Sequence, residues 1–304
     1  MEIRKIAIAI DGSPLSVASM DQAVNMACRI NSDVDLIFIE DVNLKKIANF
    51  NHIKMISPFS SSNKSIIKDK ELSDVFKSQK IRINNAINYA FKGKNLKHEF
   101  LSSEGVVEKE IVKLSKSSDL LVMAWAGWKT ANYYFSSPYI QGQSQLNFPV
   151  LSKISLSLRA KEILLKKSVS TLVLIEALPK NSETLMYFDG SEDSMNTLKY
   201  VMKNVSKMLD YDDLPYESEN ETIPLNIVVD NASLDKLKYE LKAYNKSANL
   251  IKVDKLCFDD LKSYIKKTKA KLFVSSYKAF KNLSDGIDII SDVPVSFMLV
   301  KNND

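Results

Sequence analysis

Two short apolar runs with the same ending stand far apart in the chain. Residues 6–13 read IAIAIDGS and residues 184–191 read TLMYFDGS, so each strand-like run leads into Asp-Gly-Ser, with the two aspartates 178 positions apart. After each turn, apolar residues recur at the spacing of an amphipathic helix. They are Val17, Met20, Val24 and Ala27 in the first copy and Met195, Leu198, Met202 and Val205 in the second, again 178 positions apart. The pattern predicts a duplicated strand-turn-helix unit.

The chemistry of the repeated turn explains two of its three residues. A glycine permits a sharp turn between strand and helix. Ser13 and Ser191 stand where a side-chain oxygen caps a helix, and Pro14 suits a first helical turn. Asp11 keeps two interpretations, a carboxylate that stabilises the turn or a residue that contacts a ligand.

The remaining pattern alternates strands with helices through both halves. The first half predicts strands at 33–41, 97–103, 119–125 and the end of 158–177, with helices at 77–91, 106–117 and the start of 158–177. The second predicts strands at 223–230, 249–256, 271–277 and 294–301, with helices around 232–246 and 258–269. The helix over 77–91 is expected to bury Ile81, Ile87 and Tyr89. Such alternation predicts an α/β fold of two tandem doubly wound five-stranded parallel-sheet domains.

At 304 residues the chain exceeds one ordinary domain of about 150 residues. We therefore predict a first domain over 1–180, with a long loop at 42–76 and an insert at 128–156. The second domain is expected over 181–304.

Composition narrows the function classes. A net charge of +5 comes from 42 Lys and Arg against 37 acids, with lysines spread along the chain and few arginines, which weighs against nucleic-acid binding. No apolar run approaches the roughly 18–20 residues that cross a bilayer, so we expect a cytoplasmic protein without a membrane partner. Cys28 and Cys257 lack metal-site spacing and are expected to be buried, inert thiols. His52 and His98 stand alone, so the sequence offers no catalytic or metal-ligating set and favours a non-catalytic protein.

Three segments together resemble the universal stress protein family in its tandem two-domain form. They are IAIAIDGSPLSVASMDQAVNMACRI, SEGVVEKEIVKLSKSSDLLVMAWAG and RAKEILLKKSVSTLVLI. The resemblance implies a Rossmann-like five-stranded parallel sheet in each half and a role in stress responses. Members of the family commonly pair through their last strands. The two halves are therefore expected to form an intrachain pseudo-dimer, with a homodimer as a further option.

The family also implies a nucleotide site, because many members bind ATP through Gly, two residues, Gly, nine residues, then Gly followed by Ser or Thr. In this chain Ala124 occupies the first glycine slot and Gly127 matches the second, whereas Ser137 and Pro138 stand at the close. Glycines let backbone amides approach phosphate, so the loss of two of them damages the cradle. ATP is the cofactor that the resemblance implies, through an incomplete motif.

A second alignment places the closing slot at Ser157 and Leu158 and makes residues 128–156 an insertion. We prefer it because the last helix and strand then align without a gap. In the second half, no glycine follows the corresponding strand until Gly286, and Glu192 and Asp193 at the helix start would repel phosphate. The second half is therefore predicted to bind no nucleotide.

The candidate ligand-binding residues all belong to the first half. They are Asp11, Gly12, Ser13, Ile39, Ala124, Gly127, Ser136 and Ser137. Gly127 and the Ser136-Ser137 pair also fit ordinary turns. The insert is rich in aromatic residues and is expected to fill the vacated pocket, with a surface for a protein partner or a lid over a ligand as alternatives.

Three functions remain open at this point. The first is a non-catalytic, stress-associated regulatory or partner-binding protein whose nucleotide binding is weakened or lost. The second is an ATP or ADP sensor, or a slow ATPase, with a rebuilt phosphate site. The third is a binder of a non-nucleotide small molecule.

Overall fold

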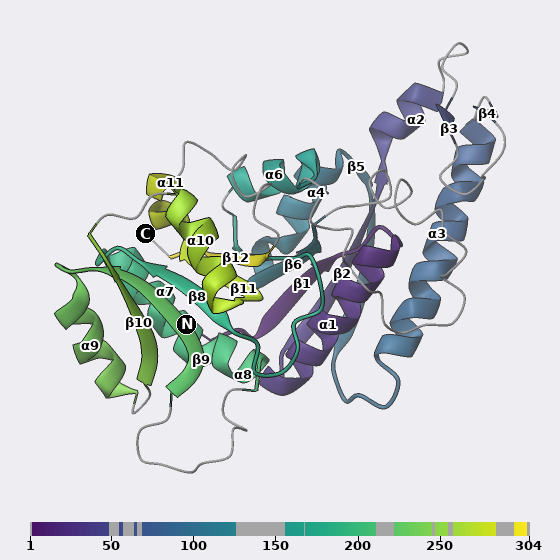
Figure 1. The fold of residues 1–304 in the computed structure, drawn as a ribbon. Helices are drawn as coiled ribbons and strands as arrows, with labels where there is room; N and C mark the ends of the chain where they lie inside the picture. Colours follow the sequence, from purple (N-terminus) through teal and green to yellow (C-terminus); the bar gives the residue numbers. More distant parts are fainter. Residues whose placement is uncertain are drawn as a thin grey trace.

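The computed structural model describes residues 2–48, 55–56, 64–65, 69–125, 156–166, 168–210, 222–244, 247–254, 258–283 and 295–302. Their strands form one ten-stranded sheet, in the order β10-β9-β8-β11-β12-β7-β6-β1-β2-β5, and a separate antiparallel pair, β3-β4 (Figure 1). The strands are β1 (Lys5–Ala9), β2 (Asp33–Asp41), β3 (Met55–Ile56), β4 (Lys64–Ser65), β5 (His98–Gly105), β6 (Leu120–Ala124), β7 (Ser170–Leu174), β8 (Thr184–Phe188), β9 (Thr222–Asp230), β10 (Ser247–Val253), β11 (Leu272–Ser276) and β12 (Ser296–Val300).

The helices follow the predicted alternation with the strands. They are α1 (Pro14–Ile30), α2 (Val42–Ala48), α3 (Asp69–Ala90), α4 (Val107–Leu114), α6 (Leu158–Leu165), α7 (Glu192–Tyr200), α8 (Ser206–Met208), α9 (Leu234–Ala243), α10 (Phe258–Thr268) and α11 (Tyr277–Leu283). A 3-10 turn (Ser115–Ser117) follows α4, and a π-helical turn (Val201–Val205) joins α7 to α8.

The two halves of the chain contribute equivalent strands in the same order, counted from the centre of the sheet to its two edges. Strands β7, β6, β1, β2 and β5 correspond in turn to β12, β11, β8, β9 and β10. Within each set of five the neighbours pair in parallel, as the sequence predicts. The last strands of the two sets, β7 and β12, pair antiparallel, with Val173 opposite Phe297 and Thr171 opposite Leu299. The two five-stranded sheets are thus joined edge to edge.

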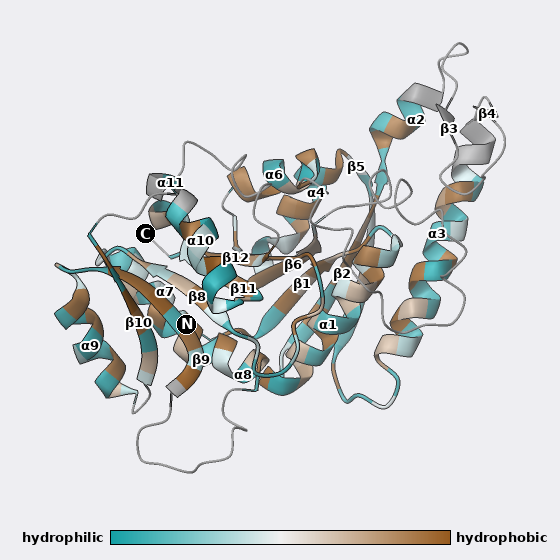
Figure 2. Ribbon diagram, viewed as in Figure 1, coloured by the Kyte–Doolittle hydropathy of each residue, from teal (hydrophilic) through white to brown (hydrophobic). Residues whose placement is uncertain are grey.

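Helices cover both faces of this sheet. One buried cluster joins alternate strand residues such as Ile6 and Ile8 to α1, α3, α7, α8 and α9. The other joins the intervening residues, such as Ala7, to α4, α6, α10 and α11. Figure 2 shows hydrophobic residues concentrated in the central strands, with polar residues on the outer sides of the helices. Burial on both faces is the reason that the strands read as nearly continuous apolar runs.

The repeated Asp-Gly-Ser turn forms as predicted. Gly12 and Gly190 adopt φ values of 74° and 75°, in the left-handed region that favours glycine. The Ser13 hydroxyl accepts a hydrogen bond from the Ser16 amide, and Ser191 accepts one from Ser194, so both serines cap their helices.

The segment between β7 and β8, where the predicted domain boundary at 180 falls, is held by an ionic contact between the halves. The Asp210 carboxylate, just after α8, lies 3.1 Å from Arg29 Nε of α1 and 2.6 Å from Lys180 Nζ. Arg29 also donates to the Met208 carbonyl at 2.5 Å. Asp210 is therefore an anchor shared by α1, the connecting segment and the end of α8.

Several sequence predictions are wrong in detail. Cys28 is exposed rather than buried, because it faces away from the sheet on α1, and Cys257 lies outside the described residues. Part of the predicted loop 42–76 is regular, since α2 begins at Val42 and α3 begins at Asp69. Ile81 and Tyr89 are exposed by 61% and 81%. The apolar face of α3 instead runs through Phe76, Ile83, Ile87 and Ala90, a helical spacing that extends upstream of residue 77.

Candidate functional site

The candidate site lies at the carboxyl ends of β1, β2 and β6. Pairing places Ala9 opposite Ile37 and Ile8 opposite Val122. Because parallel strands advance together, Asp11, Ile39 and Ala124 come to one edge of the sheet, where ligands of doubly wound folds bind.

Asp11 takes part in the turn that it begins. Its Oδ1 accepts a hydrogen bond from the Ser13 amide at 2.9 Å, and its own amide donates to Ser16 Oγ at 3.3 Å. Ser13 is fully buried. These bonds are what a turn-stabilising carboxylate requires, so the conformation of Asp11 is explained without a ligand.

The end of β6 carries a residue that the sequence prediction missed. Trp125 is fully buried, its amide donates to the Leu174 carbonyl at 2.9 Å, and its carbonyl accepts from the Ser157 amide at 3.2 Å. Its ring meets Phe297 of β12 edge-on, with centroids 5.7 Å apart. A tryptophan at the end of a buried strand was the available signal, because so large a side chain must fill space where it is buried. Trp125 thus links the edge of the candidate site to the other half of the chain.

Charged side chains gather at the end of β2 on both faces of the sheet. Glu40 lies 2.6 Å from Lys80 and 3.2 Å from Lys45, and Lys45 lies 2.6 Å from Glu104. Burial raises the pKa of Glu40, but hydrogen bonds and charges from Lys80 and Lys45 outweigh it and hold that pKa below its ordinary value. The hydrogen bond from Lys45 to Glu104 raises the pKa of Lys45. This network keeps Glu40 ionised.

The adjacent residue, Asp41, is buried and paired with α6. Its Oδ2 meets Arg159 Nη2, and its Oδ1 accepts from the Asn43 amide at 2.9 Å. The Ser157 hydroxyl caps α6 by accepting from the Ala160 amide at 3.2 Å. Asp41 and Arg159 were both missed as site residues. Charges on separate elements leave no local signal in a sequence, which accounts for the omission.

In the second half, the corresponding strand ends carry more internal bonds. Asp189 Oδ1 accepts from the Ser191 amide at 3.1 Å and from the hydroxyls of Ser191 and Ser194. Beside it, burial raises the pKa of Tyr187 to about 12, with the charges of Asp189 and Asp230 adding to the effect.

The phosphate-loop position of the second half is occupied by a helix. α11 begins at Tyr277, directly after β11, and the Ser276 hydroxyl accepts from the Ala279 amide at 3.0 Å. Asp193 at the start of α7 lies 3.0 Å from Lys278 of α11. Over residues 277–283, a helix therefore stands where a glycine loop would begin, while Gly286 lies outside the described residues.

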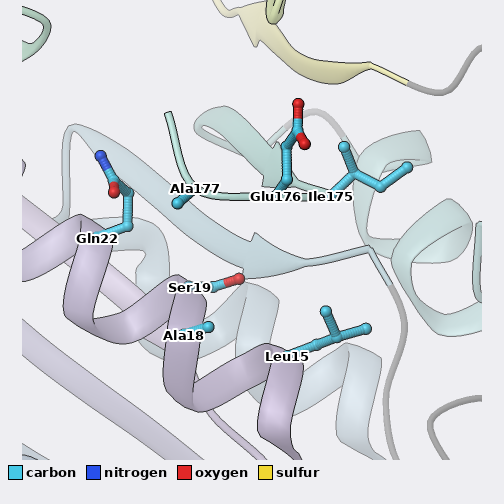
Figure 3. A pocket seen from close by; sticks show the side chains of 7 residues that line it. All are labelled: Leu15, Ala18, Ser19, Gln22, Ile175, Glu176 and Ala177. Carbon is cyan, nitrogen blue, oxygen red and sulfur yellow. The ribbon is translucent and has the colours of Figure 1, made fainter. Parts of the chain in front are cut away.

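A small pocket lies where α1 faces the segment after β7 (Figure 3). Gln22 Nε2 donates to the Leu178 carbonyl at 2.8 Å, and Glu176 pairs with Lys271 at 2.7 Å. The cavity measures about 10 Å³, which is at most enough for one water molecule and far below typical ligand pockets of roughly 300–1,000 Å³. It is lined by Leu15, Ala18, Ser19, Gln22, Ile175, Glu176 and Ala177.

Comparison with solved structures identifies the architecture. A universal stress protein from Archaeoglobus fulgidus DSM 4304 matches with a TM-score of 0.61 at 13% identity, over 100% of this chain and 98% of the other. The fold of this chain is therefore that of the universal stress proteins. A putative universal stress protein from Pseudomonas aeruginosa UCBPP-PA14 gives 0.56 at 11%, over 98% and 93%. A protein of unknown function from P. aeruginosa PAO1 gives 0.57 at 10%, over 98% and 92%. No family model and no curated protein matches the sequence.

Within this universal stress fold, five of the eight predicted site residues can be placed. Asp11, Gly12, Ser13, Ile39 and Ala124 lie at one sheet edge. The other three, Gly127, Ser136 and Ser137, lie outside the described residues, as does the insert up to residue 155. Across the described ranges, no group of three or more His, Cys, Asp or Glu side chains could hold a metal ion. Likewise, none of the helices in those ranges is long and apolar enough to cross a membrane.

Proposed function

We propose that the protein is a tandem member of the universal stress protein family, non-catalytic and cytoplasmic, that acts by binding a partner, with nucleotide binding weakened or lost. One observation carries the proposal. At the ends of β1, β2 and β8, the carboxylates are each bonded by the chain's own donors: Asp11 by the Ser13 amide, Asp41 by Arg159 and Asp189 by two serines. Donors that are committed internally are not available to a nucleotide without rearrangement.

The second half supports the same proposal through its charges. Glu192 and Asp193 form the first turn of α7, where the helix dipole would otherwise favour an anion. The helix α11 occupies the place of a glycine loop. We place any partner surface on the insert at 128–156, and the antiparallel β7–β12 pair is the contact that an intrachain pseudo-dimer would use.

The decisive experiment is a nucleotide inventory followed by a titration. The full chain is purified without added nucleotide and denatured, and the released molecules are identified by chromatography and mass spectrometry. ATP is then titrated by calorimetry. We expect no stoichiometric nucleotide and no binding stronger than the millimolar range; ATP or ADP near one per chain would overturn the proposal.

A nucleotide sensor is the second candidate, favoured by the placement of Asp11, Gly12 and Ser13 beside Ile39 and Ala124. It predicts that Asp11→Asn, which preserves an acceptor for the Ser13 amide, weakens ATP binding at least tenfold. Asp189→Asn in the second half is the matched control and should change nothing. Equal effects of the two substitutions would exclude the assignment to the first half.

A further inference from the structure

A buried carboxylate and a half-exposed arginine meet between β2 and α6. The Asp41 side chain is 3% exposed and the Arg159 side chain 46% exposed. The two oxygens of Asp41 have separate roles, because Oδ1 caps the start of α2 through the Asn43 amide whereas Oδ2 meets the Arg159 guanidinium. Arg159 therefore reaches solvent on one side while its anion partner comes from inside the protein.

The guanidinium of arginine recognises carboxylate and phosphate with the same planar set of donors. A phosphate oxygen placed where Asp41 Oδ2 lies would receive the same hydrogen bond from Arg159. Because Asp41 is attached to the chain, its effective concentration at Arg159 is in the millimolar range or above. A free anion that binds weakly cannot displace it from Arg159.

We infer that Arg159 belongs to an anion-binding position for phosphate groups, and that Asp41 occupies this position as an internal competitor. The inference rests on the proposed function, since it names one cause for weakened nucleotide binding. It also predicts a property of its own, namely that removing the carboxylate creates phosphate binding.

Neighbouring charges do not take over the role of Asp41. Glu40 points to the other face of the sheet, where Lys80 of α3 binds it. On the face of Asp41, Glu110 of α4 packs on Gly105, which lies opposite Asp41 in β5. Glu110 is bonded by Ser103 at 3.2 Å and Lys113 at 3.3 Å. Its charge weakens phosphate binding at Arg159 in all variants alike, so comparisons between variants stay valid.

The test compares full-length variants titrated with inorganic pyrophosphate by calorimetry in phosphate-free buffer. Asp41→Ser keeps a hydroxyl that can cap α2 but removes the oxygen at Arg159, and Asp41→Asn keeps the shape of the side chain. We expect pyrophosphate affinity to rise at least about tenfold over wild type in either variant. Adding Arg159→Gln should abolish the gain.

Asp35→Asn is the matched control. Asp35 is a buried aspartate on the same strand, paired with Lys5 at 2.6 Å, but far from α6 at the other end of β2. The substitution Asp35→Asn removes one negative charge and one ion pair at a distance from Arg159. It should therefore leave the affinity for pyrophosphate unchanged. A gain in Asp35→Asn equal to that in Asp41→Ser would reduce the effect to net charge and overturn the inference.

Three further outcomes also decide. Folded Asp41 variants that bind pyrophosphate no better than wild type overturn the inference, as does a gain that persists with Arg159→Gln. If both Asp41 variants stay unfolded at every pyrophosphate concentration, the carboxylate is a folding requirement and not a displaceable competitor. Tight ATP binding by the wild-type chain would instead refute the proposed function while leaving the pyrophosphate comparison to be judged on its own.

Discussion

Two glycines with the same backbone conformation but different surroundings allow a test of the repeated Asp-Gly-Ser turn. Gly190 and Gly93 have φ values of 75° and 74°. A Cβ on Gly93 would meet nothing within 4 Å, whereas a Cβ on Gly190 would lie 2.1 Å from Ser233 Oγ and 2.9 Å from Ser233 Cβ. Comparing Gly190→Ala with Gly93→Ala therefore separates the cost of the packing clash from the cost of the left-handed backbone.

The left-handed conformation costs alanine about 1–2 kcal/mol, and the stiffer unfolded chain offsets about 0.4–1 kcal/mol of it. Gly93→Ala should thus lower the free energy of unfolding by about 0–1.6 kcal/mol. Gly190→Ala adds overpacking of about 1–3 kcal/mol, for a total of about 1–4.6 kcal/mol. Gly12→Ala should fall between them, since its Cβ would lie 3.3 Å from Ile83.

The measurement is urea unfolding followed by circular dichroism, with unchanged slopes as the check on comparability. Ser233→Ala in the Gly190→Ala background should recover part of the loss, because it removes the atom at 2.1 Å but leaves the Cβ at 2.9 Å. If Gly190→Ala and Gly93→Ala cost the same, the close approach of the turn to Ser233 is not real, and the reasoning fails.

Three further predictions concern the contacts between and within the halves. Asp210→Asn should lower the free energy of unfolding by about 1–3 kcal/mol, because the 11%-exposed carboxylate of Asp210 pairs with both Arg29 and Lys180. Asp74→Asn, which removes an exposed ion pair, should cost less than about 0.5 kcal/mol, and equal losses of the two variants in denaturant titrations would contradict this. Burial raises the pKa of Tyr277 to about 12, and the hydrogen bond to Thr171 opposes this shift more weakly. The stability that this shift contributes is complete below pH 10 and is lost as the pH rises from 10 through 12. Tyr277→Phe should therefore show a shallower loss of stability across that pH window, and an unchanged slope would refute the assignment. Phe297→Ala should cost about 3–5 kcal/mol, and a double-mutant cycle with Trp125→Ala should give a coupling of about 0.5–1.5 kcal/mol, which strict additivity would disprove.

Local patterns made much of the fold predictable. The duplicated strand, Asp-Gly-Ser turn and helix appear where the offset of 178 places them, because each depends only on residues close in sequence. The early start of α3 was missed although Leu72, Val75 and Phe76 stand at helical spacing in its upstream turns, because the polar residues around them suggested a loop. Ile81 and Tyr89 misled the assignment of its buried face, since an apolar residue on a helix is not buried unless its position in the helical period faces the core.

The site was predictable only where it coincides with strand ends. Asp11, Ile39 and Ala124 follow from the topology of a parallel sheet. The pair of Asp41 with Arg159 could not be predicted, because the two residues are 118 positions apart and belong to separate elements that only the tertiary fold brings together. Trp125 could have been selected for its size, but its contact with Phe297 depends on how the two halves join.

The two halves together show why an Asp-Gly-Ser turn is weak evidence for nucleotide binding. Both halves keep the glycine conformation, the serine cap and the aspartate that accepts the amide two residues on. The second half does so although acidic residues open its helix and α11 takes the place of a glycine loop. A feature that persists where phosphate is disfavoured is sufficiently explained by the turn itself. The residues that would distinguish a nucleotide site are those that the fold does not need. At the first-half edge, we propose that the buried Asp41 facing Arg159 is such a residue, because a serine could also cap α2.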